Sequence, residues 1–259
     1  MHWRFLATPP RSGAENMALD EALLRRAASS GEAVLRIYAW SAPTLSLGRN
    51  QPAHGEYDLG ALASGGIDVV RRLTGGRAVL HHREITYSVT APLTLGATLR
   101  DAYLRINEIL LGALRSLGAN AEIAGRAGAG ERAPLPSLAP CFEEPTEGEL
   151  VLAGRKLVGS AQYREEVALL QHGSILVDDD QTDVASLLTT PVAPPPRPAT
   201  LRSALGRVPG SAEVNGAFLG ALREREDPRV EELAIDESLE RAAATARDRY
   251  VDPAWTWRR

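Results

Sequence analysis

The chain is organised around residues 141–174, which read CFEEPTEGELVLAGRKLVGSAQYREEVALLQHGS. This stretch holds Cys141, the only cysteine, and Lys156, the only lysine among 29 lysine and arginine residues. Arginine keeps its proton in proteins, whereas burial and neighbouring charges can tune a lysine amine into a base. A thiolate is the side-chain nucleophile best suited to attack acyl groups. A lone cysteine or a lone lysine would have a simple structural explanation, but finding both in one segment favours a catalytic function.

The spacing inside this stretch predicts strands that bring the two residues together. Lys156 follows Cys141 by 15 positions (156 − 141), which is room for a strand, a turn and a return strand. We predict paired strands at 149–153 and 157–163 about the AGRK turn, followed by a strand at 168–177. Small residues stand opposite one another in the last two strands: Gly159, Ser160, Gly173 and Ser174. Strands with small side chains leave a slot that a narrow acyl chain can fill.

A second distinctive stretch covers residues 71–89 and reads RRLTGGRAVLHHREITYSV. Its glycine pair, Gly75 and Gly76, permits backbone conformations that other residues resist and lets a ligand approach the main chain. Exposed amides there, with Arg71, Arg72 or Arg77 beside them, can bind an anionic or carbonyl oxygen. A glycine pair alone usually marks only a hairpin, so the neighbouring arginines carry this interpretation.

Two adjacent histidines follow the glycine pair. Successive side chains of a strand point to opposite faces, so only one of His81 and His82 can face a site. With no other histidine, cysteine or carboxylate at ligand spacing nearby, we predict no metal centre.

The remaining periodicity predicts a mixed α/β protein. We expect a strand at 2–7, a helix that Gly31 ends, and a hairpin formed by 33–40 and 44–48. Asn16 and Asp20 lie one helical turn apart, where we expect them to fix the first helix on the sheet. A long amphipathic helix is predicted at 98–117, ended by Gly118.

Composition limits the class of protein. The hydrophobic content of 44% and charged content of 24% are ordinary for a globular protein of 259 residues. The net charge of −4 argues against a nucleic-acid partner, because a phosphate backbone calls for a basic surface. One cysteine excludes an internal disulfide framework, and no apolar run has the length of a membrane span or signal peptide. We therefore expect a cytoplasmic protein that uses neither a membrane nor nucleic acid.

Three motifs together resemble the superfamily of lipoate-protein ligases, octanoyltransferases and biotin ligases. They are the N-x-A-x-D-E of residues 16–21, the block at 71–89, and GRKLVGSAQYR with LLQHGSIL after it. APCF at residues 139–142 is similar to the bacterial octanoyltransferase branch, which carries an acyl group on a cysteine. The resemblance spans most of the chain; His82 departs from it, because relatives commonly have aspartate there.

The resemblance implies a fold and a set of site residues. The fold would be α/β (α+β), of class II synthetase and biotin-ligase type, with a mixed, largely antiparallel sheet flanked by helices. Residues 1–190 would form the catalytic domain, and residues 191–259 a proline-rich connector and a helical C-terminal appendage packed on the core. The catalytic residues would be Cys141 and Lys156. Substrate-binding residues would be Arg72, Thr74, Gly75, Gly76, Arg77, His81, Gly159, Ser160, Ala161 and His172.

The implied function is octanoyl transfer from acyl carrier protein, through a cysteine thioester, to a lysine of a lipoyl domain or the glycine cleavage H protein. No cofactor is implied, and we expect a monomer because no apolar helix face is left over. Three alternatives remain open at this point. They are an ATP-dependent lipoate-protein ligase, an amidotransferase that moves octanoyl between lipoyl domains, and a non-enzymatic acyl-binding module.

Overall fold

A central sheet organises the computed structural model, which describes residues 1–125, 146–190 and 192–258. Within these residues the sheet has six strands, in the order β10 (Val158–Glu165), β11 (Ala168–Leu176), β6 (Glu84–Pro92), β2 (Ala33–Tyr38), β1 (Trp3–Ala7) and β12 (Glu231–Glu232). The first four strands are antiparallel neighbours, and β1 runs parallel to both β2 and β12. The predicted mixed, largely antiparallel sheet is therefore confirmed.

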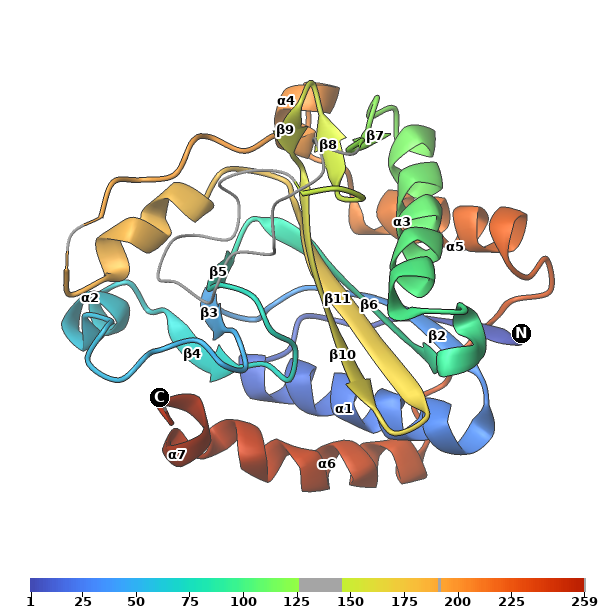
Figure 1. Cartoon of the computed structure of the whole chain (residues 1–259), viewed down its shortest axis with the longest axis horizontal. Coiled ribbons are helices and arrows are strands. Elements are labelled where there is room, and N and C mark those ends of the chain that lie inside the picture. The colour runs from blue at the N-terminus through green and yellow to red at the C-terminus, as the bar shows by residue number, and fades with distance from the viewer. Residues whose placement is uncertain (126–145, 191, 259) are drawn as a thin grey trace.

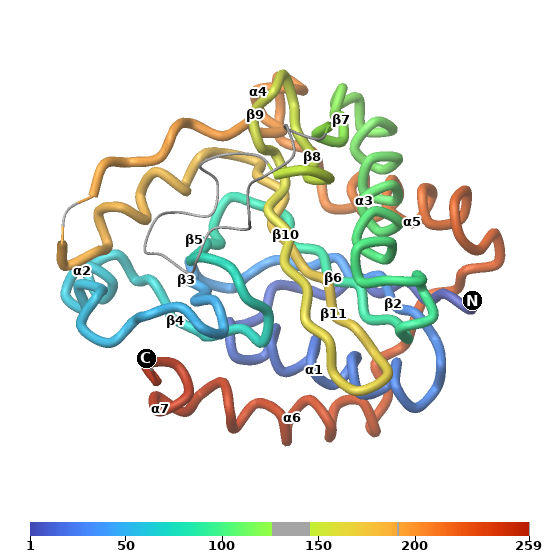
Figure 2. Tube along the Cα trace, in the orientation of Figure 1, coloured from blue at the N-terminus to red at the C-terminus, as the bar shows by residue number. Residues whose placement is uncertain are grey.

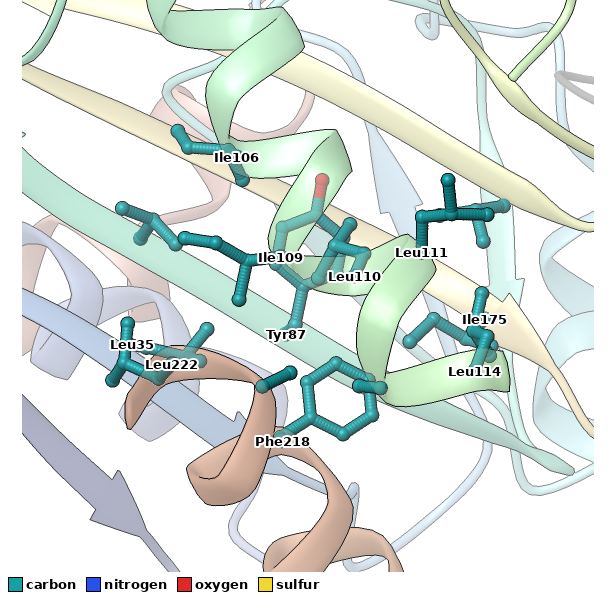
Figure 3. Packing of buried hydrophobic residues seen from close by; sticks show 14 of the residues in the cluster. Leu35, Tyr87, Ile106, Ile109, Leu110, Leu111, Leu114, Ile175, Phe218 and Leu222 are labelled. Carbon is teal, nitrogen blue, oxygen red and sulfur yellow. The ribbon is translucent and has the colours of Figure 1, made fainter. Parts of the chain in front are cut away.

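Helices cover both faces of this sheet (Figure 1). On one face lie α3 (Leu99–Ser116) and α5 (Ser211–Arg225), whose apolar residues form the largest core cluster with the strands. Figure 3 shows Leu110 and Leu114 of α3, Tyr87 of β6 and Phe218 of α5 gathered in this cluster. The other face packs against α1 (Gly13–Ser30), and α6 (Glu237–Val251) lies along α1 (Figures 1 and 2).

Local signals explain where the long helices begin and end. Ser12 accepts a hydrogen bond from the amide of Glu15, and the Glu15 side chain reaches back to the amide of Ser12, so α1 begins with a capping box. It ends at Gly31, whose φ of 72° is the left-handed conformation that glycine adopts without strain. The prediction that this helix ends at Gly31 is confirmed.

The predicted hairpin of residues 33–40 and 44–48 is wrong. Both edges of β2 are already occupied, by β1 on one side and β6 on the other. The next strand, β3 (Thr44–Leu47), instead forms a separate small sheet between β4 (Asp68–Arg71) and β5 (Val79–His81). The glycine pair, Gly75 and Gly76, lies in the connection between β4 and β5 of this second sheet.

A short hairpin carries Lys156, and its register differs from the prediction. The return strand begins within the AGRK motif, because β8 (Leu150–Leu152) pairs with β9 (Arg155–Lys156) and not with β10. Ala153 and Gly154 form the two-residue turn with φ of 49° and 73°, as a tight hairpin turn requires. A third strand, β7 (Glu122–Ile123), pairs with β8 and completes this small sheet.

The remaining elements pack on this framework. The short helices are α2 (Leu59–Ser64), η1 (Leu93–Leu95), η2 (Gln181–Leu187), α4 (Leu201–Leu205) and α7 (Pro253–Thr256). Residues after 190 add α5 to one face of the core, β12 to the sheet edge and α6 to the other face. The division at residue 190 stays a prediction. Among the described residues, no helix combines the length and apolar character needed to cross a membrane.

Candidate active site

A pocket opens on the face of the sheet that α1 covers. Its walls come from α1, the main sheet, the small β3–β4–β5 sheet and the turn after β4. The lining residues are Met17, Tyr38, Trp40, Ser46, Arg72, Gly76, Val79, His81, Thr86, Gly159, Ser160, Ala161, His172, Gly173 and Ser174. The strand register places Gly159 opposite Ser174 and Ser160 opposite Gly173, so the predicted pairing of small residues is confirmed. These small residues leave the part of β10 and β11 that borders the pocket largely free of bulky side chains.

The buried carboxylate of Asp20 organises the floor of this pocket. It accepts hydrogen bonds from Arg36 Nη1 (2.8 Å), Ser88 Oγ (2.7 Å), the Tyr38 hydroxyl (3.0 Å) and His172 Nδ1 (3.4 Å). The sheet register explains the cluster, because His172 lies opposite Ser88 and Ser88 lies opposite Arg36, so all three side chains point toward α1.

The same cluster sets the ionisation of its members. Burial alone would raise the pKa of Asp20, but the Arg36 guanidinium and the hydrogen bonds from His172 and Ser88 lower it below its usual value. Burial lowers the pKa of His172, against the opposing effect of Asp20. At neutral pH the pocket therefore presents a neutral imidazole beside a charge-balanced Asp20–Arg36 pair.

Arg72 shapes the turn that carries the glycine pair. Its guanidinium donates to the carbonyl oxygens of Ser46 (2.7 Å), Gly75 (2.8 Å) and Arg77 (2.7 Å). Its Nε also donates to Thr74 Oγ1, which lies 2.7 Å from His172 Nε2. The predicted substrate-binding arginine thus holds the turn that forms one wall of the pocket.

His81 and Trp40 form a neighbouring part of the pocket wall. Their rings stack with centroids 4.1 Å apart, and His81 Nε2 lies 2.8 Å from Ser46 Oγ. The other ring nitrogen of His81 lies 3.4 Å from Glu84 Oε1. His82 is exposed, so only one of the two histidines faces the pocket, as the strand alternation predicts.

Lys156 lies at the end of the β8–β9 hairpin, two residues before β10 begins. Its side chain is 6% exposed, and its Nζ lies 2.8 Å from Glu149 Oε1. The other carboxylate oxygen of Glu149 accepts from the amide of Thr146 at 2.8 Å. Cys141, the predicted nucleophile, lies outside the described residues, so its distance to Lys156 stays a prediction.

The structure brings most of the predicted site residues together. Those in the pocket wall are Arg72, Gly76, His81, Gly159, Ser160, Ala161 and His172. Thr74, Gly75 and Arg77 do not line the pocket, but each makes a hydrogen bond with Arg72 in the turn. Their roles toward a substrate stay predictions. Among the described residues, no group of three or more histidine, cysteine or carboxylate side chains could hold a metal ion.

Several pocket residues were not predicted from the sequence. Tyr38 is the last residue of β2 and Trp40 follows two positions later, where the sequence shows only an ordinary β-rich run. Asp20 was expected to fix α1 on the sheet, and its bond to Arg36 agrees with that, but its contact with His172 was not foreseen. Arg36 could have been found from its position between apolar residues of a predicted strand. An arginine buried in this way needs a buried anion as its partner.

Comparison with known families defines the class of protein. The model of the lipoyl protein ligase A/B catalytic domain matches residues 12–223, and the chain belongs to this family. Similar curated proteins narrow the class. The chain is 47% identical to the octanoyltransferase LipM of Moorella thermoacetica over 195 residues, covering 73% of this chain and 70% of that protein. It is 39% identical to the octanoyltransferase LipM of Symbiobacterium thermophilum over 235 residues, covering 84% of each.

Solved structures support the same fold. A lipoate-protein ligase A bound with ATP matches with a TM-score of 0.78 and 24% identity, covering 99% of each chain. The bi-partite lipoate protein ligase of Thermoplasma acidophilum matches with a TM-score of 0.76 and 24% identity, covering 99% of this chain and 96% of that one. At this identity the likeness concerns the fold alone.

Proposed function

We propose that the chain is an octanoyltransferase that carries the acyl group on Cys141 and transfers it to a lysine of a lipoyl domain. The relatives at 39–47% identity that cover most of the chain are octanoyltransferases, and this supports the activity. The observation that carries the proposal is the pocket on the face of the sheet that α1 covers, whose lining from β10 begins three residues after the buried Lys156.

The pocket would take the octanoyl chain. Glycine, serine and alanine line β10 there, so an unbranched chain can lie against the backbone. Burial of about six methylene groups at ~0.8 kcal/mol each contributes on the order of 5 kcal/mol, which favours octanoyl over very short chains. Arg72, His81 and His172 would border the chain, and the amides of Gly75 and Gly76 are candidates to bind the carbonyl oxygen.

The chemistry would pass through a thioester on the enzyme. The Cys141 thiolate attacks the thioester of octanoyl-acyl carrier protein, and the carrier leaves as a thiolate that takes up a proton. The ε-amine of the acceptor lysine then attacks the acyl-enzyme and gives up a proton, and Cys141 leaves as the thiolate with which the cycle began. An amide is more stable than a thioester, so the overall transfer needs no ATP.

Intact-protein mass spectrometry tests this function. After mixing with octanoyl-acyl carrier protein without ATP, the native chain should gain one octanoyl group that neutral hydroxylamine removes. Because the chain has a single cysteine, Cys141→Ser should gain no hydroxylamine-labile group. Lys156→Met should slow acylation by about 10²- to 10⁴-fold, the usual contribution of a positioned acid or base.

Three results would change the assignment. If no adduct forms but a lipoyl domain is acylated from free octanoate and ATP, the chain is a ligase. If only an octanoylated lipoyl domain serves as donor, the chain is an amidotransferase. If the acyl group binds without any transfer, the chain is a binding module.

A further inference from the structure

The buried ion pair of the β8–β9 hairpin decides in which form Lys156 rests. A neutral amine can take the thiol proton directly, whereas an ammonium can only stabilise a thiolate that has already lost its proton. An unperturbed lysine has a pKa of about 10.4, so it must be desolvated strongly before it is neutral at physiological pH. The residues around Lys156 therefore determine which of the two routes is open.

Glu149 is placed to favour the ammonium. Its Oε1 lies 2.8 Å from Lys156 Nζ, and both side chains are almost entirely removed from solvent, at 7% and 6% exposure. The carboxylate is itself fixed, because its second oxygen accepts from the Thr146 amide and the Glu149 amide donates to the Thr146 carbonyl. A fixed anion at this distance favours the charged form of a lysine.

Two buried tyrosines on the described elements also interact with this pair. Tyr103 of α3 and Tyr87 of β6 interact electrostatically with Glu149, and Tyr103 also interacts with Lys156. Burial raises the pKa of both hydroxyls, with Glu149 adding to the increase, so both stay neutral at physiological pH. Neither tyrosine therefore supplies a charge that would oppose Glu149.

We infer that Glu149 is a positioning residue that holds Lys156 as an ammonium in the resting chain. If the proposed function holds, Cys141 then works from a thiolate–ammonium pair and not through a neutral amine base. In the first half-reaction the thiolate attacks the donor thioester, and Lys156 gives its proton to the departing carrier thiolate. In the second half-reaction the neutral Lys156 takes a proton from the attacking acceptor amine, and Cys141 leaves as the thiolate. One proton passes through Lys156 in each direction, so the resting state is restored.

Because Lys156 is the only lysine, its titration can be measured directly in the full chain. The chain is labelled with lysine carrying ¹³C at Cε, and the single lysine signal is followed by NMR from pH 6 to 11. We expect the native signal to stay that of an ammonium across the neutral range. Glu149→Gln should lower the Lys156 pKa by about one to three units, the usual effect of losing an opposite charge nearby. Glu149→Asp, which keeps the charge, should retain most of the native value.

Glu147→Gln is the matched control, because Glu147 lies on the same loop but is exposed and pairs with Arg100. It should leave the Lys156 titration unchanged. A native Lys156 that is neutral at pH 7 would overturn the inference, as would a Glu149→Gln chain that folds normally but titrates like the native chain. A merely structural role of Glu149 would not move this titration in a folded variant.

A second measurement tests the link to Cys141. The rate of alkylation of the single thiol by iodoacetamide, followed against pH, gives the thiol pKa. We expect a value below the usual ~8.5 in the native chain and a higher one in Lys156→Met. A native thiol pKa near 8.5 that Lys156→Met does not change would overturn the thiolate–ammonium pair. Absence of any octanoyl adduct would instead overturn the proposed function and leave the NMR result standing.

Discussion

Replacement of Asp20 by asparagine should strongly destabilise the fold, because it leaves the Arg36 guanidinium buried without its counter-charge. Arg36 is 0% exposed and Asp20 is 1% exposed, so water cannot replace the lost partner. Removal of one member of a buried ion pair typically costs 3–5 kcal/mol. The asparagine also has one acceptor oxygen in place of two, so some of the four donors around Asp20 lose their partner.

We expect the free energy of unfolding to fall by about 4 kcal/mol in Asp20→Asn, which is a change of roughly 10³ in the unfolding equilibrium. With a slope of about 3 kcal/mol per molar urea, the midpoint of a urea titration would move by ~1.3 M. Asp248→Asn is the matched control, because Asp248 is exposed on α6 and its change should stay within about 0.5 kcal/mol.

The destabilisation should depend on pH. The pKa of Asp20 in the folded chain lies below the ordinary ~3.9, so its carboxylate stabilises the fold fully above that value. This contribution is lost as the pH falls through the folded-state pKa, so the difference between native and variant should narrow in acid. A loss under 1 kcal/mol at pH 7 would refute the assignment of Asp20 and Arg36 as a buried charge pair. So would additive effects of Asp20→Asn and Arg36→Met, because a coupled pair should show an interaction energy of about 0.5–3 kcal/mol.

Two further predictions concern the supports of the glycine turn. A Cβ on Gly48 would lie 1.9 Å from the Gly76 carbonyl oxygen, so Gly48→Ala should displace the turn. We expect this displacement to lower kcat/KM for the octanoyl donor by about 100-fold. Gly216→Ala is the control, because open space surrounds Gly216 and kcat/KM should stay unchanged. Trp255 Nε1 donates a hydrogen bond to the Arg71 carbonyl. Trp255→Phe, which removes this bond, should lower the free energy of thermal unfolding by ~1 kcal/mol, and Trp255→Ala, which also removes the ring, by roughly 2–3 kcal/mol. Equal losses in the two variants would contradict a specific hydrogen bond.

The sequence was sufficient to predict the elements whose signals are local. The capping box and Gly31 define α1 without any knowledge of the partners of this helix. The alternation of a strand separates His81 from His82 in the same way. The small residues of β10 and β11 face each other because the two strands are joined by a short turn, which fixes their register.

The parts that sequence reasoning missed depend on contacts between distant segments. Arg36 and Asp20 meet only because β2 lies in the sheet that α1 crosses, and the sequence does not state which strands are neighbours. The failed hairpin of residues 33–40 and 44–48 has the same cause, since the competing partners of β2 are β1 and β6. Arg71 likewise donates a hydrogen bond to the Thr256 carbonyl in α7, 185 positions away. No local pattern in the sequence indicates that α7 contacts the strand before the glycine turn.

One strand, β10, joins the two halves of the proposed chemistry. Its pocket residues follow Lys156 within a few positions. The register of β10 against β11 therefore decides which side chains line the proposed acyl pocket. The position at which the strand begins decides where Lys156, the proposed acid–base group, lies. A shift of this register by one residue would turn Gly159 and Ala161 to the opposite face. Gly173 enforces the close pairing, since a Cβ there would lie 2.3 Å from the Gly159 carbonyl oxygen. The pocket and Lys156 therefore cannot be adjusted independently, and a substitution that changes the acyl length accepted through β10 should also alter the rate of proton transfer by Lys156.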